Sequence, residues 1–600
     1  MKTGDRFPRQ TQLQATVAVV VLLSTMLMVA PTAADDAGDR PAATFFLPVE
    51  VPLVNVEVVV TDDDGVPITG LTESDFEVLE DGEPVEITNF FASRLLPEQP
   101  GGQEIQPTGS PPPDQQLYLA LYIDDLDTDA RRRTVVLDHL REFLEQPLPP
   151  NVKTMLVRFD GELHVESDLT DDTDQLLAAL DATRDMSVTS RQRDEQALLR
   201  EMQRATTDQR DQIRTFINTL HPPTTDRRPP AFEEPDNQPV YQNFLPQIHA
   251  VARANSLRAR ASLDALQRFV GYLNGVPGRK AVVWVGGLDT RPGEELFLAW
   301  EELFPNVVRR QGVQPMMEAQ QYDLTLDLQE LLEFANSERI SFYTVSSLGA
   351  GLERISSTED SGRDQSRTSA FTDVWGQEDA LHMMSGFTGG RTLMDNRNLD
   401  RQLADVSAEL GSYYSLGYTP PSPGDGEYHT ITVKVRRQDV RVRHRMGYRV
   451  TPVRDPMTDR TLAAATLGIA DNPLRIALDT QVQEPRAEGG FLVPVELRIP
   501  LGDLVLMPEG DHHAANISVV SVVRDEHGRL SEVHEREYPI EIANDELLSA
   551  VSQQAGFVLG MVLREGPHRI AISVQDTNSM IESTAYVDVV VGEPGTDETG

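Results

Sequence analysis

The stretch LYLALYIDD, residues 117–125, decides the fold that we expect for this chain. Seven apolar or aromatic residues in a row are typical of a strand that is buried on both faces, and the run ends at two aspartates. KTMLVRF (153–159), AVVWVGG (281–287) and ERISFYTV (338–345) are further strands of this kind, and TVVLDHLREFLEQ (134–146) has helical spacing. Strands that alternate with helices predict a parallel sheet covered by helices on both faces.

The segments on either side of this region have the alternating pattern of β structure. Residues 46–95 alternate apolar with polar positions and contain Asp81-Gly82, a hairpin turn signal. Residues 470–592 form short alternating strands between Gly, Asp and Pro turns, typical of an antiparallel β-sandwich. We therefore predict an α/β fold with a doubly wound, mainly parallel sheet over residues 116–450, flanked by an N-terminal β module and the sandwich. The remaining segments are a linker at 96–115, long insertions near 186–244 and 351–377, and a disordered tail at 593–600.

The N-terminus has the layout of an export signal. Lys2, Arg6 and Arg9 precede an apolar run over residues 15–30, and the small residues up to Ala34 suit a cleavage site. We predict a signal peptide over residues 1–34, a secreted or periplasmic location, and no membrane span after cleavage. An uncleaved anchor is the alternative.

Charge and cysteine content exclude several classes of function. The formal net charge is −42, from 95 acidic against 53 basic side chains, which argues against a nucleic-acid partner. The sequence has no cysteine, so disulfides, thiolate metal sites and cysteine nucleophiles are excluded.

The acidic loop after the first strand is the candidate site. Ligands of open parallel sheets bind beyond the carboxyl ends of the strands. Asp124, Asp125, Asp127, Thr128 and Asp129 stand at that position, and their oxygens suit Mg²⁺ or Ca²⁺. The competing interpretation is that they cap the following helix. An EF-hand loop does not fit, because Ala130 and Val136 stand where its glycine and glutamate belong.

The order of motifs along the chain resembles the von Willebrand factor A-related proteins of the acidobacterial type. The resemblance covers about residues 46–450. It rests on the following stretches: LVNVEVVVTDDDGVPITGLTESDFEVLEDGEPVEITNF (53–90), LYLALYIDD (117–125), VPGRKAVVWVGG (276–287), SGFTGGRTL (385–393), SYYSLGYTP (412–420) and HRMGYRV (444–450). It implies an A-type domain, in which a divalent cation is held by an Asp-x-Ser-x-Ser loop, a distant Thr and a distant Asp, and is completed by a partner's carboxylate.

The metal ligands of that family are only partly present in this sequence. By resemblance, Asp124 matches the first Asp and Thr128 replaces the second Ser, whereas Leu126 stands at the first Ser and Gly286 at the distant Asp. Thr189, or else Ser190, would supply the distant hydroxyl.

Asp125 or Asp127 could compensate for the missing ligands, and Asp289 lies three residues beyond the empty position 286. The resulting metal set is Asp124, Asp127, Thr128 and Thr189, and we expect no certain cofactor, with Mg²⁺ or Ca²⁺ as the ions that would fit.

Long loops support binding of a protein partner. The segments 221–242 and 351–377 exceed ordinary connections, and Phe371 and Trp375 are the residues most able to anchor a partner. The partner-binding set is Asp124, Asp125, Asp127, Thr128, Phe371 and Trp375. His512-His513 beside Asp511 lacks a third ligand at a defined spacing.

These observations lead to one principal hypothesis and two alternatives. The first is an exported, non-enzymatic adhesion or assembly protein that recognises another envelope or extracellular protein through the top of the A-type domain, with a degenerate metal-ion-dependent adhesion site. The second is a metal-dependent binder or sensor of the envelope with a rebuilt site. The third, an envelope hydrolase, has no motif in its favour.

Overall fold

The structure is a computed structural model, and it divides into two compact units whose described parts lie within residues 53–449 and 456–592. The described residues are 53–63, 65–93, 116–126, 128, 130–149, 152–186, 195, 197–205, 244–276, 278–346, 379–394, 398–422, 426–449, 456–486 and 489–592. The predicted signal peptide 1–34, linker 96–115 and tail 593–600 lie outside them, as do the insertion 351–377 and most of 186–244.

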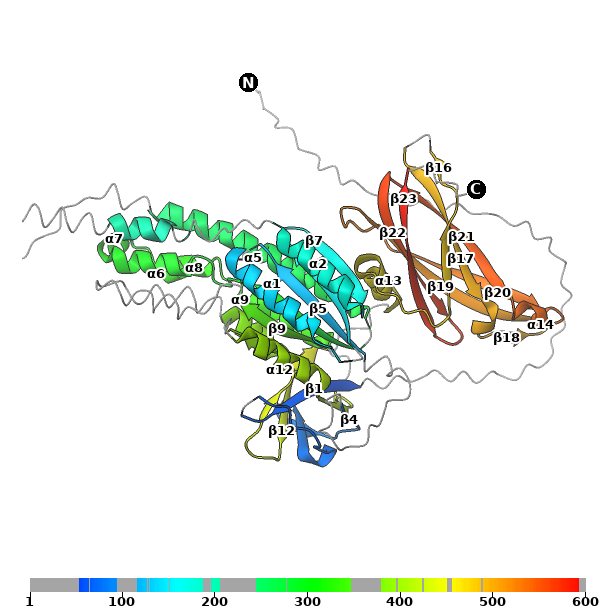
Figure 1. Ribbon diagram of the computed structural model, residues 1–600, viewed down its shortest axis with the longest axis horizontal. Coiled ribbons are helices and arrows are strands. Elements are labelled where there is room, and N and C mark those ends of the chain that lie inside the picture. The colour runs from blue at the N-terminus through cyan, green and yellow to red at the C-terminus, as the bar shows by residue number, and fades with distance from the viewer. Residues whose placement is uncertain are drawn as a thin grey trace, which may run out of the picture. The chain divides into compact units, whose positions relative to one another are not determined.

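The first unit is built around a six-stranded sheet (Figure 1). In spatial order its strands are β10 (Arg391–Leu393), β9 (Ile340–Ser346), β8 (Arg279–Gly286), β5 (Leu117–Asp124), β6 (Val152–Phe159) and β7 (Leu163–Thr170). All neighbouring pairs are parallel except β6 and β7. The predicted mixed α/β fold with a mainly parallel sheet is therefore confirmed.

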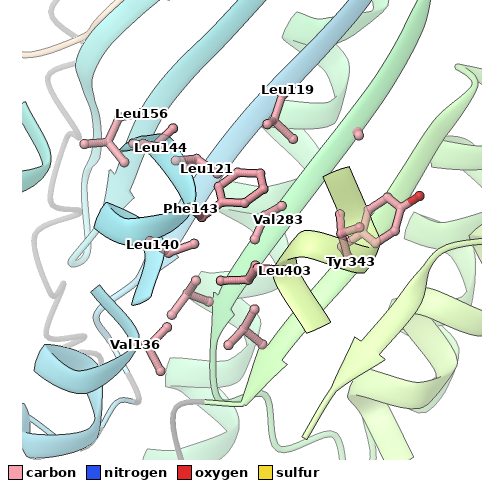
Figure 2. Packing of buried hydrophobic residues seen from close by; sticks show 14 of the residues in the cluster. Leu119, Leu121, Val136, Leu140, Phe143, Leu144, Leu156, Val283, Tyr343 and Leu403 are labelled. Carbon is pink, nitrogen blue, oxygen red and sulfur yellow. The ribbon is translucent and has the colours of Figure 1, made fainter. Parts of the chain in front are cut away.

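Helices cover both faces of this sheet, as the apolar strands require. Helices α1 (Ala130–Glu145), α2 (Thr173–Asp185) and α12 (Leu399–Gly411) share one core with alternate residues of the strands, including Leu119 and Leu121 (Figure 2). Side chains alternate across a strand, so Tyr122 and Asp124 point to the opposite face. There the Tyr122 ring lies 5.3 Å from that of Phe269 in α5 (Phe244–Asn274), and α9 (Thr325–Ser337) packs on β9.

A helical lobe extends beyond the carboxyl ends of the parallel strands. Helix α5 has 31 residues and is about 46 Å long, whereas the 8-residue strand β8 spans about 26 Å. The chain leaves the carboxyl end of β8 into α6 (Glu294–Leu303), α7 (Pro305–Gln311) and α8 (Pro315–Gln320). These helices and residues 197–205 form one apolar cluster with the N-terminal part of α5 (Figure 1). The lobe, defined as residues 197–205, 244–252 and 294–320, therefore belongs to the carboxyl edge of the sheet.

The first unit also contains a small β domain made from two distant segments. One sheet has the order β13-β1-β11-β4 and the other β14-β12-β2-β3, and both contribute to one core. The strands are β1 (Val54–Thr61), β2 (Phe76–Glu80), β3 (Glu83–Val85), β4 (Asn89–Ala92), β11 (Tyr414–Tyr418), β12 (Tyr428–Val435), β13 (Arg441–Arg443) and β14 (Gly447–Arg449). A 3-10 turn, Glu73–Asp75, precedes β2.

This arrangement corrects the predicted boundary at residue 450. We assigned residues 414–449 to the α/β domain, but their strands pair with residues 54–92, for example Val54 with Tyr418 and Glu80 with Ile431. The N-terminal β module is therefore half of a domain, and the α/β domain is inserted into it.

The small β domain docks on the amino edge of the parallel sheet, at the start of β8 and β9. The Arg339 guanidinium pairs with Glu57 of β1, and the Arg445 guanidinium donates to the backbone oxygens of Asn55 (2.8 Å) and Asn336. Burial alone would raise the pKa of Glu57, but Arg339, Arg445 and Arg279 outweigh it and lower that pKa. The carboxylate thus stays ionised within the contact.

Glycines allow a close approach of backbones just before β10. At Gly390 an added Cβ would lie 1.8 Å from the Phe342 carbonyl oxygen, and Gly389 has a φ of 78°. The glycine-rich stretch SGFTGG therefore lets the chain turn tightly before β10.

The second unit consists of two antiparallel sheets over one shared core, preceded by α13 (Pro456–Leu467). One sheet contains β15 (Ala477–Thr480), β16 (Glu484–Pro485), β17 (Phe491–Pro500) and β21 (Gln554–Leu563). The other contains β18 (Met507–Glu509), β19 (His512–Asp525), β20 (His534–Ala543), β22 (Gly566–Asp576) and β23 (Glu582–Val591). A 3-10 turn, Leu501–Asp503, and α14 (Leu547–Ala550) connect strands. Within the described ranges, no helix has the length and apolar character needed to span a membrane.

Candidate functional site

The acidic loop begins where β5 ends, at the carboxyl edge of the sheet. Asp124 is only 1% exposed, and its Oδ1 accepts a hydrogen bond from the Leu126 backbone N–H at 3.0 Å. The Thr128 hydroxyl is buried and donates to the Asp124 carbonyl oxygen at 2.6 Å. The structure therefore brings Asp124 and Thr128 together through bonds that serve the tight turn at the start of the loop.

Asp125 is committed to an ion pair inside the protein. Its two carboxylate oxygens accept from Nε and Nη2 of Arg133 at 2.6 and 3.0 Å, and both side chains are at most 3% exposed. Arg133 also donates to the Thr183 carbonyl at the end of α2. Burial raises the pKa of Asp125, and the guanidinium opposes part of that rise. Asp125 therefore fastens the loop to α1 and α2 and is not placed to replace a metal ligand.

The position of the family's distant aspartate has no room for a carboxylate. An added Cβ at Gly286 would lie 2.8 Å from the Trp284 indole and 2.9 Å from the Asp124 Cβ. Gly286 has an ordinary φ, so the glycine is required here by space and not by backbone conformation. An aspartate at residue 286 would therefore clash with the buried indole and with the Asp124 side chain unless these moved. The structure therefore offers no carboxylate at the family's distant-aspartate position.

Other residues of the carboxyl edge are held by local contacts. The Asp289 Oδ1 accepts from the Arg291 backbone N–H at 2.9 Å, so this carboxylate supports its own turn. The Arg291 side chain pairs with Asp379 at 2.8 Å, which ties the start of the 379–388 helix to the loop after β8. The hairpin between β6 and β7, residues 160–162, lies on this edge and is exposed.

Several predicted site residues lie outside the described residues. They are Asp127, Asp129, Thr189, Ser190, Phe371 and Trp375. Their assignments as metal or partner ligands stay predictions.

The histidine pair of the second unit does not assemble a site among the described residues. His512 lies beside Asp511 at 3.2 Å, and His513 pairs with Asn544 at 2.8 Å, so the two rings have separate partners. Two groups of described residues do bring three potential ligand atoms within 4.8 Å of one another: Glu80, Asp81 and His429, and His139, Glu142 and Asp400.

Sequence reasoning missed the first of these groups, which lies in the small β domain. Asp81 was interpreted only as a turn residue, and Glu80 and His429 come from segments 349 positions apart. A signal was present in the alternation of both strands. Glu80 continues the inward series of Phe76 and Val78, and His429 stands in the inward series of β12. Polar residues at core positions of a strand indicate a specific role.

Comparisons with known proteins do not assign the chain. It matches no protein-family model and no curated protein. The crystal structure of a conserved hypothetical protein, BatB from Bacteroides thetaiotaomicron, is 9% identical over 49% of this chain and 98% of that one, with a TM-score of 0.19. A mutant of the PilB minor pilin from Streptococcus sanguinis is 10% identical over 50% of this chain and 62% of that one, with a TM-score of 0.21. Scores this low establish neither a shared fold nor a function.

Proposed function

We propose that this chain is an exported, non-enzymatic binding protein of the von Willebrand factor A-like type, which recognises another protein through the carboxyl edge of its parallel sheet. The observation that carries the proposal is that the two edges of the parallel sheet are occupied differently. The amino edge is occupied by the small β domain through Arg339, Arg445 and their partners. The carboxyl edge carries the loops and the helical lobe, and binding sites of open α/β sheets form on that edge.

The proposed interaction does not pass through a cation at Asp124. Two observations support this: Trp284 lies within 3 Å of where a side chain at residue 286 would begin, and Arg133 engages Asp125. The partner would then be recognised by side chains of the edge itself. The export signal predicted at residues 1–34 supports an envelope or extracellular partner.

The test uses the whole chain, because residues 116–450 alone would lack the strands that pair with β11 and β12. The chain is used to capture proteins from an envelope fraction, and each recovered protein is then purified. Its affinity is measured for the unaltered chain and for two carboxyl-edge variants. Glu162→Lys changes the exposed β6–β7 hairpin, and Met317→Glu changes a side chain of the lobe that is 63% exposed.

The matched control is Asp171→Lys, an exposed charge reversal at the amino end of the sheet, just after β7. We expect at least one carboxyl-edge variant to weaken binding by about tenfold and the control to stay within about twofold. Equal affinities for all variants, or a loss only with Asp171→Lys, would overturn the proposal.

A further inference from the structure

Three potential metal ligands converge at the turn after β2. The Nδ1 of His429 in β12 lies 2.8 Å from Oδ2 of Asp81 and 3.9 Å from Oε1 of Glu80. Four ligands arranged tetrahedrally around Zn²⁺ lie roughly 3.3–3.4 Å apart, given metal–ligand distances of about 2.0–2.1 Å. The two observed separations bracket that value, so shifts of about half an ångström would accommodate the ion.

Each carboxylate is oriented by the protein through its other oxygen. The hydroxyls of Tyr418 and Tyr448 donate to Oε2 of Glu80 at 2.6 and 2.9 Å. The backbone N–H and the hydroxyl of Thr430 donate to Oδ1 of Asp81 at 2.8 and 3.0 Å. Outer hydrogen bonds of this kind fix the ligands of metal sites, and here they leave Oε1 and Oδ2 directed at the same histidine nitrogen.

The charge and the accessibility of the group also suit a cation. Glu80 and His429 are buried, whereas the Asp81 side chain is 51% exposed, so the group opens to solvent on one side. Two carboxylates beside one imidazole carry an excess negative charge that one divalent ion would neutralise.

We propose that Glu80, Asp81 and His429 form a site for a divalent transition ion, with Zn²⁺ the best fit, in which water takes the fourth position. Nitrogen and carboxylate ligands are those that zinc accepts. On binding, Nδ1 of His429 gives its proton to solvent, and the lone pair that is freed binds the metal.

The ion would link the two chain segments that form the small β domain. Asp81 and His429 are separated by 348 positions, a stretch that contains the whole inserted α/β domain. A link that closes so long a loop restricts the unfolded chain, so metal binding stabilises the folded domain.

The experiment titrates metal-free full chain with Zn²⁺ by calorimetry, and repeats the titration with Co²⁺, whose visible absorption is intense in tetrahedral coordination. We expect one ion per chain and a rise of roughly 3–5 °C in the unfolding midpoint at a Zn²⁺ concentration about 100 times Kd. Affinity should fall as pH decreases, because protons compete for His429.

The variants Asp81→Asn and His429→Gln each remove one ligand. Asn tolerates the left-handed backbone of residue 81, where φ is 49°, so that variant keeps the turn. We expect each to weaken Zn²⁺ binding at least tenfold and to abolish the tetrahedral Co²⁺ spectrum.

The control is His139→Gln, which changes the similar but surface-exposed group of His139, Glu142 and Asp400. Binding should be unaffected by this change. No stoichiometric binding by the unaltered chain, or a loss with His139→Gln in place of the two ligand variants, would overturn the proposal and leave His429 and Asp81 as an ion pair only.

Discussion

The loop after β5 and the turn after β2 differ in what their carboxylate oxygens bind, and their amino-acid composition does not reveal this difference. The loop has four carboxylates within residues 124–129, whereas the turn has two carboxylates and takes its histidine from a strand far along the chain. Yet both oxygens of Asp125 in the loop bind Arg133 and one oxygen of Asp124 accepts from the Leu126 N–H, whereas the carboxylates of the turn face one imidazole. The number of acidic residues therefore says less about a metal site than the direction of their oxygens.

The physical reason lies in what each carboxylate already binds. Asp125 has both oxygens engaged by one guanidinium, so a cation would have to displace a buried ion pair. At the turn, Asp81 has one oxygen held by Thr430 and the other beside His429, which can exchange a proton for a metal. Four experiments test this contrast.

The largest expected effect is that of Arg133→Met in the loop. The change leaves the Asp125 carboxylate buried without its partner, which should lower the free energy of unfolding of the first unit by about 3–5 kcal/mol near pH 7. Because burial raises the folded-state pKa of Asp125 above its unfolded value, the penalty should shrink as pH falls and the carboxylate takes up a proton. Denaturant unfolding at pH 7 and pH 5 measures both effects.

The matched control for this change is Arg141→Met on the same helix. Arg141 pairs with Asp181 at 2.5 Å, but the two side chains are 38% and 52% exposed, so Arg141→Met should lower the free energy of unfolding much less than Arg133→Met does. Similar losses for Arg133→Met and Arg141→Met would show that the Asp125 pair is not the buried anchor of the loop.

The next largest effect is expected for Gly286→Ala, which fills the space beside Asp124. Gly286→Ala places a methyl group within 3 Å of Trp284 and Asp124, which should cost about 1–3 kcal/mol. The same substitution at Gly271, in α5, meets no atom within 4 Å and should stabilise the helix by about 0.5–1 kcal/mol. Thermal unfolding of the two variants should therefore shift in opposite directions. If Gly286→Ala left the unfolding midpoint unchanged, the Trp284 indole would have to move aside, and a carboxylate could then be accommodated at position 286.

Local sequence patterns predicted the parallel sheet because each strand is a continuous apolar run that must be buried on both faces. They did not predict the pairing of residues 54–58 with 414–418, because contacts between distant segments leave no trace in local periodicity. The site was predicted only in its location, since the acidic residues follow β5 directly. The role of Trp284 depends on a close approach between neighbouring strands, which a single sequence does not encode.

The buried ion pair of Arg133 could have been predicted from the position of this arginine on helix α1. Arg133 stands at the same face of α1 as Val136, Leu137 and Leu140, with spacings of three, four and seven. An arginine in the apolar stripe of a helix indicates a buried acidic partner. Asp125 is the carboxylate that the structure supplies.

A smaller effect on stability is expected for Asp81→Asn at the turn, and it should depend on pH. The hydrogen bond from His429 is the main cause that lowers the pKa of Asp81 in the folded protein. Its contribution to stability is therefore present above the unfolded pKa of about 4 and disappears as pH falls through the lower folded value. Asp81→Asn should cost less than about 1 kcal/mol at pH 6.5 in metal-free buffer, since the side chain is half exposed, and the cost should shrink as the pH falls below about 4. If the loss of stability caused by Asp81→Asn did not change with pH, it would arise from the backbone of the turn and not from the ionised carboxylate.

The smallest expected effect is that of Mg²⁺ or Ca²⁺ on the acidic loop. A cation that binds only the folded chain raises the unfolding midpoint with its concentration. Because Gly286 provides no carboxylate and Asp125 is held by Arg133, millimolar Mg²⁺ should shift the midpoints of the unaltered chain and of Asp124→Asn by the same small amount. A shift that Asp124→Asn removes would restore the loop as a metal site and would reverse the contrast with the turn. Zn²⁺ in the same assay should shift both proteins equally, because its ligands at Glu80, Asp81 and His429 are untouched by that substitution.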